Sequence, residues 1–231
     1  LGALADTLPD RAALARHHNL RHIAFPETLL AAEASRRDPR PAALRAAKAG
    51  LDPTMRFDTW TAHEDLRYDR TLLGDLTSLR FLDAGQSAII LGPVGVGKSH
   101  LATALGHMAI RRRHSVLFSR ADKLFTRLRA ARLDNTLDAE IRRLATVDVL
   151  ILDDFALRPL DATETSDFYE IVVERHRTKT TIATSNREPA EWLTMTADTL
   201  LAQSAIDRLT AAAHILVIEG PSYRQRTRRP A

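Results

Sequence analysis

The stretch from residue 92 to residue 99 has a composition that a packed core would not favour. Its letters, GPVGVGKS, match the pattern G-x-x-x-x-G-K-[ST] at every position. Glycines in such a loop let successive backbone N–H groups face one anion, and the dipole of the following helix adds to the attraction. We therefore predict a cradle for nucleotide phosphates, in which Lys98 contacts the β- and γ-phosphates and the Ser99 hydroxyl binds Mg²⁺. The residues assigned to nucleotide binding are Gly92, Pro93, Val94, Gly95, Val96, Gly97, Lys98, Ser99 and His100.

A pair of carboxylates, Asp153 and Asp154, follows the apolar run VDVLIL. In proteins with this kind of phosphate loop, a carboxylate at the end of a neighbouring strand holds Mg²⁺, so we assign Asp153 to the metal. Asp154 is the candidate general base, which orients or deprotonates an attacking water. The second acid favours hydrolysis of the γ-phosphate over its transfer to another substrate. A simple turn that contains two aspartates is the alternative.

Three further polar residues are candidates for contacts with the nucleotide. Asn186 ends the stretch TTIATSN, after Thr184 and Ser185, and either touches the γ-phosphate, holds the attacking water or simply makes a turn. Arg208 lies in a helix of otherwise small and apolar residues; it either reaches the site of a neighbouring subunit or forms a local ion pair with Asp207 or another acid. Arg224, in GPSYRQR, contacts either the nucleotide bound by its own subunit or DNA, and the sequence leaves both alternatives open. The chain lacks the guanine-reading pattern N-K-x-D, which favours ATP over GTP.

Short apolar runs alternate with helical stretches and must position these residues. The expected strands are 87–91, 115–119, 147–152, 180–184 and 214–218. Strands that are apolar on both faces and alternate with helices indicate a parallel sheet covered on both sides, so we predict a three-layer α/β domain of about 175 residues. An amphipathic helix is expected at about 64–83, and residues 1–50 are expected to form two or three short helices.

Composition excludes several classes of function. The chain has no cysteine, which removes disulfides, thiolate metal sites and cysteine nucleophiles and fits a cytoplasmic location. We see no membrane span and no secretory signal. Because the sequence does not begin with Met, we expect a fragment or a processed chain. The formal net charge of +4 matches the basic tail, which contains Arg224, Arg226, Arg228 and Arg229 and no acid; this tail is either an arm for phosphate backbones or a solvated terminus.

The complete set of motifs resembles a known family. The stretches GPVGVGKSHLATAL, VDVLILDDF, TSNREPAEWL, LLAQSAIDRL and IEGPSYRQR are similar, in order and spacing, to those of the IstB-like transposition helper ATPases. These belong to the AAA+ superfamily, beside the DnaC helicase loaders and DnaA initiators. The resemblance covers about residues 55–229 and implies a parallel sheet of order 5-1-4-3-2 without a C-terminal helical lid. It also implies a helical domain at 1–55, followed by the ATPase domain at 56–231.

The resemblance also implies functional roles and partners. Lys98 and Ser99 fall on the Walker A positions, Asp153 and Asp154 on Walker B, Asn186 on sensor 1 and Arg208 on the arginine finger. ATP and Mg²⁺ would bind at subunit interfaces of an oligomer that assembles on double-stranded DNA, bends it, and recruits and stimulates a transposase. Many AAA+ proteins have Asp-Glu where this chain has Asp-Asp, so we expect slow hydrolysis.

Two other stretches leave alternatives open. Within the helix-rich stretch 121–146, Arg127, Arg129 and Arg132 either present a cationic face to phosphates or lie on a solvated helix surface. Phe57 and Trp60 either pack near the adenine or fill a hinge.

Three other functions compete with transposition. A DnaC-like helicase loader shares almost all of the motifs; the lack of cysteine speaks weakly against it, because loaders often carry a zinc-binding element. A nucleotide-gated adaptor and a small-molecule kinase are the remaining alternatives, and we find no acceptor pocket or lid for a kinase.

Overall fold

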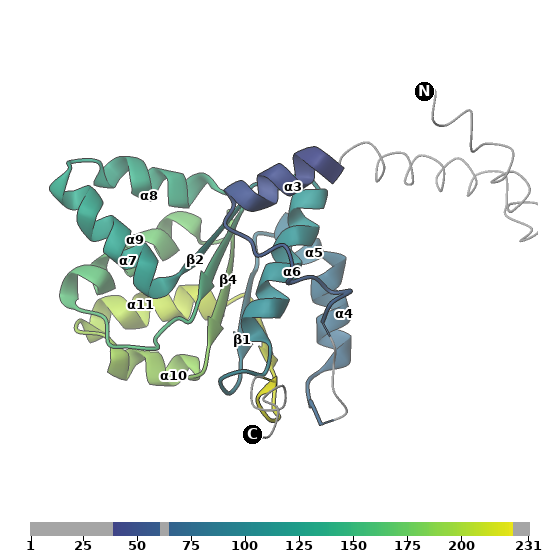
Figure 1. Ribbon diagram of the computed structural model, residues 1–231. Helices are drawn as coiled ribbons and strands as arrows, with labels where there is room; N and C mark the ends of the chain where they lie inside the picture. The colour runs from purple at the N-terminus through teal and green to yellow at the C-terminus, as the bar shows by residue number, and fades with distance from the viewer. Residues whose placement is uncertain (1–38, 61–64, 224–231) are drawn as a thin grey trace, which may run out of the picture. The chain divides into compact units, whose positions relative to one another are not determined.

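The computed structural model describes residues 39–60 and 65–223. The chain divides into two compact units, Leu1–Leu44 and Arg45–Ala231. The described elements of the second unit build an α/β sandwich, shown in Figure 1. The domain boundary near residue 55 stays a prediction, and the expected helices of residues 1–38 lie outside the described residues.

A parallel sheet of five strands forms the centre of the second unit, in the order β2-β3-β4-β1-β5. The strands are β1 (Ser87–Leu91), β2 (Val116–Arg120), β3 (Val149–Asp153), β4 (Thr180–Ser185) and β5 (Ala213–Val217). This confirms the predicted order 5-1-4-3-2, which is the same order counted from the opposite edge. The predicted bounds of β1 are confirmed, and the predicted bounds of the other four strands differ from the observed ones by at most two residues.

Burial along each strand follows its place in the sheet. Every residue of the central strands β3 and β4 is buried, because helices cover both of their faces. The edge strands β2 and β5 contain half-buried and exposed residues. Burial therefore follows position in the sheet and not apolar composition alone, since β4 has the sequence TTIATS and the edge strand β5 has the sequence AHILV.

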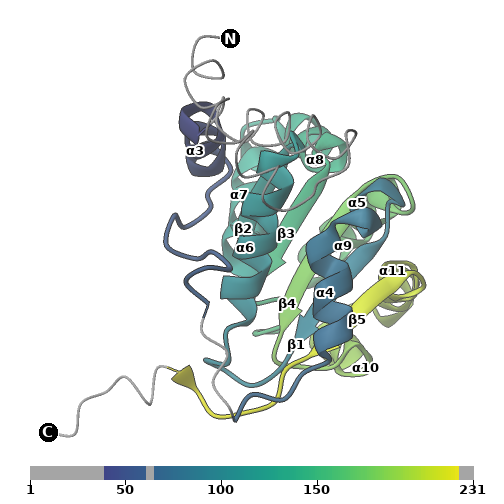
Figure 2. The ribbon, with the colours of Figure 1, turned by 90° about the vertical axis from the view of Figure 1, so that its right-hand side faces the viewer.

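Helices cover both faces of the sheet, as Figures 1 and 2 show. One layer contains α4 (Arg70–Ser78), α5 (Arg80–Asp83) and α6 (Lys98–Arg111). The other contains α7 (Ala121–Leu133), α8 (Leu137–Thr146), α9 (Ala162–Arg175), α10 (Pro189–Trp192), the 3₁₀ turn Leu193–Met195 and α11 (Thr199–Thr210). A continuous apolar core fills the space between this second layer and the sheet and includes Phe125, Leu128, Leu152, Phe168 and Trp192. Helix α3 (Pro39–Lys48) comes before both layers in the chain.

The single helix predicted at about 64–83 is wrong. The chain forms two helices, α4 and α5, which are separated at Leu79, where φ is 59°. Asp69 caps the first helix by accepting hydrogen bonds from two backbone N–H groups. The break places Leu79, Phe81 and Leu82 in the core, which explains why the periodic pattern does not continue as one helix.

Candidate functional site

The phosphate loop lies between the carboxyl end of β1 and the amino end of α6, as its sequence predicts. In an open α/β sheet, ligands bind at the carboxyl edge where the strand order changes direction, and β1 lies at that place between β4 and β5. Gly97, with φ of 104°, precedes the first residue of α6, and a side chain there would approach the Trp60 indole nitrogen to 3.0 Å. Glycine at this position therefore leaves room for the Trp60 ring beside the amino end of α6.

Lys98 is held inside the curve of the loop. Its side-chain amine donates hydrogen bonds of 2.8 Å to the carbonyl oxygens of Gly92 and Pro93, and the residue is only 7% exposed. Ser99 follows on the first turn of α6 and is half-buried. A lysine amine and a hydroxyl at the positive end of a helix are suited to a polyphosphate and to the cation that accompanies it.

The predicted acidic pair lies at the same edge of the sheet. Asp153 is the last residue of β3 and is 5% exposed, whereas Asp154 is half-buried and has φ of 55°. The left-handed backbone at Asp154 turns the chain directly after the strand, so the two carboxylates have different environments. The side-chain oxygen of Asp154 lies 3.9 Å from Nε of Arg120, the last residue of β2.

Thr184 joins both acids and was not assigned a role from the sequence. Its hydroxyl donates a 2.6 Å hydrogen bond to Oδ1 of Asp153 and accepts a 3.0 Å hydrogen bond from the backbone N–H of Asp154. The residue is fully buried near the end of β4. The signal available in the sequence was a hydroxyl residue at the end of an apolar strand, and Asn186 drew the assignment instead.

Asn186 follows β4 directly and is exposed. Leu91 pairs with Ser185 in the sheet, and the N–H of Gly92 donates to the carbonyl oxygen of Ser185 at 3.3 Å. Asn186 therefore comes one residue after the point at which β4 meets the phosphate loop. Its contact with a γ-phosphate or a water stays a prediction.

Two segments far apart in the sequence lie against the loop. The backbone N–H of Tyr223 donates to the carbonyl oxygen of Gly95 at 2.9 Å. Trp60 lies near Gly97 and packs edge-to-face on Tyr68, with ring centroids 5.5 Å apart. Contacts of Trp60 and Phe57 with adenine stay predictions.

His100 packs against the segment before the loop. Its Nε2 lies 2.8 Å from the carbonyl oxygen of Arg56 and 3.4 Å from the hydroxyl of Thr59. This histidine fixes residues 56–59 on α6, and a contact with nucleotide stays a prediction.

Arg208 lies away from this cluster. It is near the end of α11 and lines a pocket with Ser87 and Lys179, at the edge where the strands begin. Its guanidinium donates to the Ser204 carbonyl oxygen at 2.9 Å, and its Cζ lies 6.0 Å from the centroid of the Tyr169 ring. Within the described residues no ion pair joins it to Asp207. Arg224 lies outside the described residues.

The arginines of α7 form ion pairs within the chain. Arg127 pairs with Glu140 at 3.1 Å, Arg129 with Asp161 at 2.7 Å and Arg132 with Asp167 at 2.8 Å. Acids of α8 and of the start of α9 therefore match these cations one by one. The interpretation of this helix as an unbalanced cationic face is not supported.

The oxygen groups at the site fit a magnesium ion. Magnesium in nucleotide sites takes one or two carboxylates, with phosphate oxygens and waters completing its shell. Asp153 and Ser99 supply one carboxylate and one hydroxyl near the loop. No group of three or more His, Asp or Glu suited to a metal occurs within residues 39–60 and 65–223. In the same described part of the chain, no helix has the length and apolarity that crossing a membrane requires.

The loop, the acids beyond it and the order of the sheet define a P-loop ATPase of the AAA+ type. The chain belongs to the family of IstB-like ATP binding proteins, whose model matches residues 1–231.

Individual relatives agree with that membership. An ATP-binding protein in an insertion sequence of Mycobacterium tuberculosis is 37% identical over 229 residues, which are 99% of this chain and 91% of that protein. The IS21 ATP-binding protein of Pseudomonas aeruginosa is 38% identical over 163 residues, 71% of this chain and 62% of its own length.

Solved structures share the fold at lower identity. The DnaC helicase loader has a TM-score of 0.61 at 19% identity, with 72% of this chain and 97% of that chain covered. The replication initiator DnaA, solved with AMPPCP and single-stranded DNA, has a TM-score of 0.59 at 23% identity, with 74% and 50% covered.

Proposed function

We propose that this chain is an ATP-dependent, DNA-binding regulator of transposition. It assembles on double-stranded target DNA, remodels that DNA, and recruits and stimulates a transposase while it hydrolyses ATP slowly. The observation that carries the proposal is the meeting of the phosphate loop with the Asp153–Thr184 pair at one sheet edge, in a chain whose relatives are ATP-binding proteins of insertion sequences.

Each residue at the site has a stated task in this proposal. Lys98 binds the β- and γ-phosphates. Ser99 and Asp153 would hold Mg²⁺, which would neutralise phosphate charge. Asp154 accepts the proton of the attacking water, and Asn186 positions that water. Arg208 acts on the nucleotide of a neighbouring subunit, because its own loop lies at the opposite edge of the sheet.

The Walker A lysine gives the first test. Lys98→Ala removes the amine inside the loop, and we expect it to abolish binding of a fluorescent ATP analogue in a titration. Lys123→Ala, which removes an exposed lysine of α7, is the matched control and should bind like the unaltered protein. Unchanged affinity after Lys98→Ala would show that the nucleotide site is elsewhere.

The assembly itself is tested by electron microscopy of the protein with a duplex and a non-hydrolysable ATP analogue. Rings or filaments on bent duplex support the proposal. Asp154→Ala should give the same assemblies with ordinary ATP, because binding persists while hydrolysis stops.

The alternative function is a helicase loader, and the specific observation that favours it is the coverage of 97% of the DnaC chain at a TM-score of 0.61. A complex with a hexameric helicase, together with a preference for single strands over duplex, would favour this alternative.

A further inference from the structure

The segment that follows β5 lies against the phosphate loop. Residues 218–223, which we call the strap, run on from the end of β5 at the carboxyl edge of the sheet, and Figure 2 shows them in yellow. At one end of the strap, the backbone N–H of Ile218 donates to the carbonyl oxygen of Leu91, the last residue of β1, at 2.8 Å. At the other end, the N–H of Tyr223 donates to the carbonyl oxygen of Gly95 at 2.9 Å. The strap therefore contacts the residue before the loop and the loop itself.

The contact at Gly95 leaves no space for a side chain on this part of the loop. A Cβ atom at Gly95, where φ is 86°, would clash with the hydroxyl oxygen of Ser222. Glycine at this position therefore lets the backbone of the strap reach the backbone of the loop.

One peptide group connects the strap with the place assigned to the phosphates. The carbonyl oxygen that accepts from Tyr223 belongs to the peptide group between Gly95 and Val96, and the N–H of that group is the Val96 donor. Backbone N–H groups of such a loop are the donors to phosphate oxygens. Hydrogen bonds at the two ends of one peptide group polarise it and strengthen each other. A phosphate in the loop therefore strengthens the hold on the strap, and a held strap strengthens the contact with phosphate.

Backbone hydrogen bonds and little buried surface hold the strap in place. Arg67 and Glu219 exchange both of their backbone hydrogen bonds, each 2.9 Å long, in an isolated antiparallel bridge. Glu219, Pro221 and Tyr223 are exposed, whereas Ile218 is buried. Segments with few buried contacts and exposed hydrogen bonds open at the lowest cost in a folded protein. The strap is therefore an element that a bound ligand can order.

The basic tail begins where the strap ends. Arg224 is the next residue, and residues 224–229 include four arginines and no acid. Cations of this density bind phosphate backbones electrostatically. A tail that starts from a fixed strap has already lost part of its conformational freedom, so its binding to a duplex costs less entropy.

We propose that the strap couples the phosphate loop to the basic tail, so that a nucleotide in the loop and a duplex on the tail each tighten the binding of the other. The inference rests on the proposed function and names the element that carries nucleotide dependence into DNA binding. The coupling is reciprocal: the factor by which a duplex raises the affinity for nucleotide equals the factor by which nucleotide raises the affinity for the duplex.

A disulfide lock tests the strap directly, because the chain has no cysteine of its own. Arg67 and Glu219 form a hydrogen-bonded antiparallel pair, and the Cα atoms of such a pair are about 5.5 Å apart, which a disulfide can span. The double variant, Arg67→Cys with Glu219→Cys, is titrated with a fluorescent non-hydrolysable ATP analogue. Each titration is made with and without a duplex short enough to hold one copy of the chain, so that assembly does not contribute.

Oxidation should remove the coupling. In the reduced variant, as in the unaltered protein, we expect the duplex to raise the affinity for the analogue by about fivefold or more. After oxidation the strap stays on the loop, so the affinity without duplex should rise to the level that the duplex produced before. The duplex should then add less than about twofold, because it no longer selects between two states of the strap. Arg67→Cys alone, treated with the same oxidant, should keep the coupling.

Gly220→Ala perturbs the strap in the opposite direction. At Gly220, where φ is 143°, a side chain would come within 2.8 Å of Cδ2 of Leu66 and 2.9 Å of the carbonyl oxygen of Asp65, so it displaces the strap. We expect the coupling to fall below about twofold. Gly74→Ala, in α4, is the matched control and should keep the coupling, because a side chain there meets no described atom within 4 Å.

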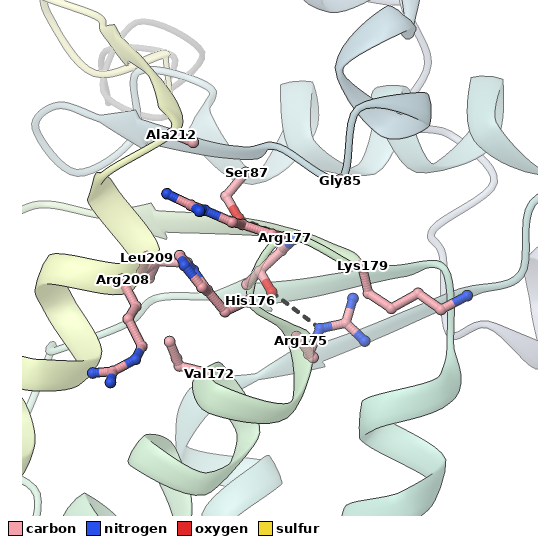
Figure 3. A pocket seen from close by; sticks show the side chains of 11 residues that line it. Gly85, Ser87, Val172, Arg175, His176, Arg177, Lys179, Arg208, Leu209 and Ala212 are labelled. Carbon is pink, nitrogen blue, oxygen red and sulfur yellow. Dashed lines mark hydrogen bonds between the residues drawn. The ribbon is translucent and has the colours of Figure 1, made fainter.

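The pocket in Figure 3 supplies a control for charge, because it lies at the opposite edge of the sheet, where the strands begin. The guanidiniums of Arg177 and Arg208 point in different directions there, and Lys179 forms a 2.6 Å ion pair with Asp148. Arg177 is exposed, so Arg177→Gln removes one positive charge far from the strap. This variant should keep the coupling.

Coupling that persists in the oxidised double variant or in Gly220→Ala overturns the inference, and so does a lack of coupling in the unaltered protein. In these cases the proposed function stands, provided that the unaltered protein binds both the analogue and the duplex. If it binds either of them not at all, both proposals fail. A non-reducing gel shows whether the disulfide has formed within one chain, and without it Gly220→Ala decides alone.

Discussion

A single hydroxyl sets the geometry of the acidic pair. Thr184 donates to the buried carboxylate of Asp153 and accepts from the backbone of Asp154, so it ties the end of β4 to the turn after β3. A buried carboxylate that loses a hydrogen-bond donor is costly, because no water replaces the lost partner. Thr184 is therefore a positioning residue: it acts through Asp153 and Asp154.

Thr184→Val tests that role. The substitution keeps the shape and removes both hydrogen bonds of the hydroxyl, so we expect the free energy of unfolding to fall by about 1–3 kcal/mol. We also expect kcat for ATP hydrolysis to fall by about tenfold or more, while affinity for ATP without Mg²⁺ stays normal. Thr184→Ser restores the hydroxyl and should restore kcat. A stability loss without any change in kcat would leave Thr184 as a purely structural residue.

The sequence predicted the positions of some site residues but not the contacts between them. The places of Lys98 and Asp153 could be predicted, since a loop pattern and an acid after an apolar strand specify position along the chain. The link from Thr184 to Asp153 could not, because it depends on the register of β3 against β4, and pairing between strands is not visible in one sequence. The ion pairs of Arg129 and Arg132 with acids of the α9 region could not be predicted either, because they depend on how α7 packs against α9.

At the scale of elements, the beginnings of β2, β3 and β4 are joined by Asp148. Its side chain accepts hydrogen bonds from the backbone and hydroxyl of Ser115 and pairs with Lys179. Burial alone would raise the pKa of Asp148, but the hydrogen bonds from Lys179 and Ser115 outweigh it and lower the pKa from 3.8 to about 2. These contacts hold three strands in place at the edge of the sheet where the strands begin.

This shift predicts the pH dependence of stability. A carboxyl whose pKa is lowered by folding contributes stability above its unfolded pKa, near 4, and loses it as the pH falls to about 2. Because the Asp148 side chain is 37% exposed, we expect only about 1 kcal/mol at pH 7. Urea unfolding of Asp148→Asn should show that deficit at pH 7 and almost none at pH 2. Asp75→Asn, which alters an exposed aspartate of α4, is the control and should differ by less than about 0.5 kcal/mol. A deficit of equal size at both pH values would contradict the ionic origin.

Element boundaries show where periodic patterns fail as predictors. The pattern at 64–83 predicts one helix because Leu79 fits an apolar face. The chain instead adopts a left-handed residue there and directs Phe81 into the core. Packing of the second, short helix decides this break, and packing is a property of the folded molecule.

At the scale of the whole molecule, the sheet order and the separation of the loop from Arg208 follow from the alternation of strands and helices. A parallel α/β sandwich places every strand end at one edge and every strand start at the other, so the phosphate loop lies at the first edge and Arg208 at the second. Charge is also distributed unevenly along the chain. The basic tail has a net charge of +4, and the remaining residues sum to about zero.

The tail supplies the last prediction, which concerns affinity for duplex DNA and its dependence on salt. The role of residues 224–231 as a DNA contact stays a proposal, and their charge makes it measurable. Each neutralised phosphate contributes about 0.9 to the slope of log affinity against log salt, so replacing Arg224, Arg226, Arg228 and Arg229 by Gln should flatten that slope by up to about 3.6. Replacing the same four residues by Lys keeps the charge and should keep the slope, which separates electrostatic contact from any effect specific to arginine. If the Gln and Lys variants bind duplex with the same salt dependence as the unaltered protein, the tail does not contact the phosphate backbone, and DNA binding must depend on the surface of the assembled ATPase domains.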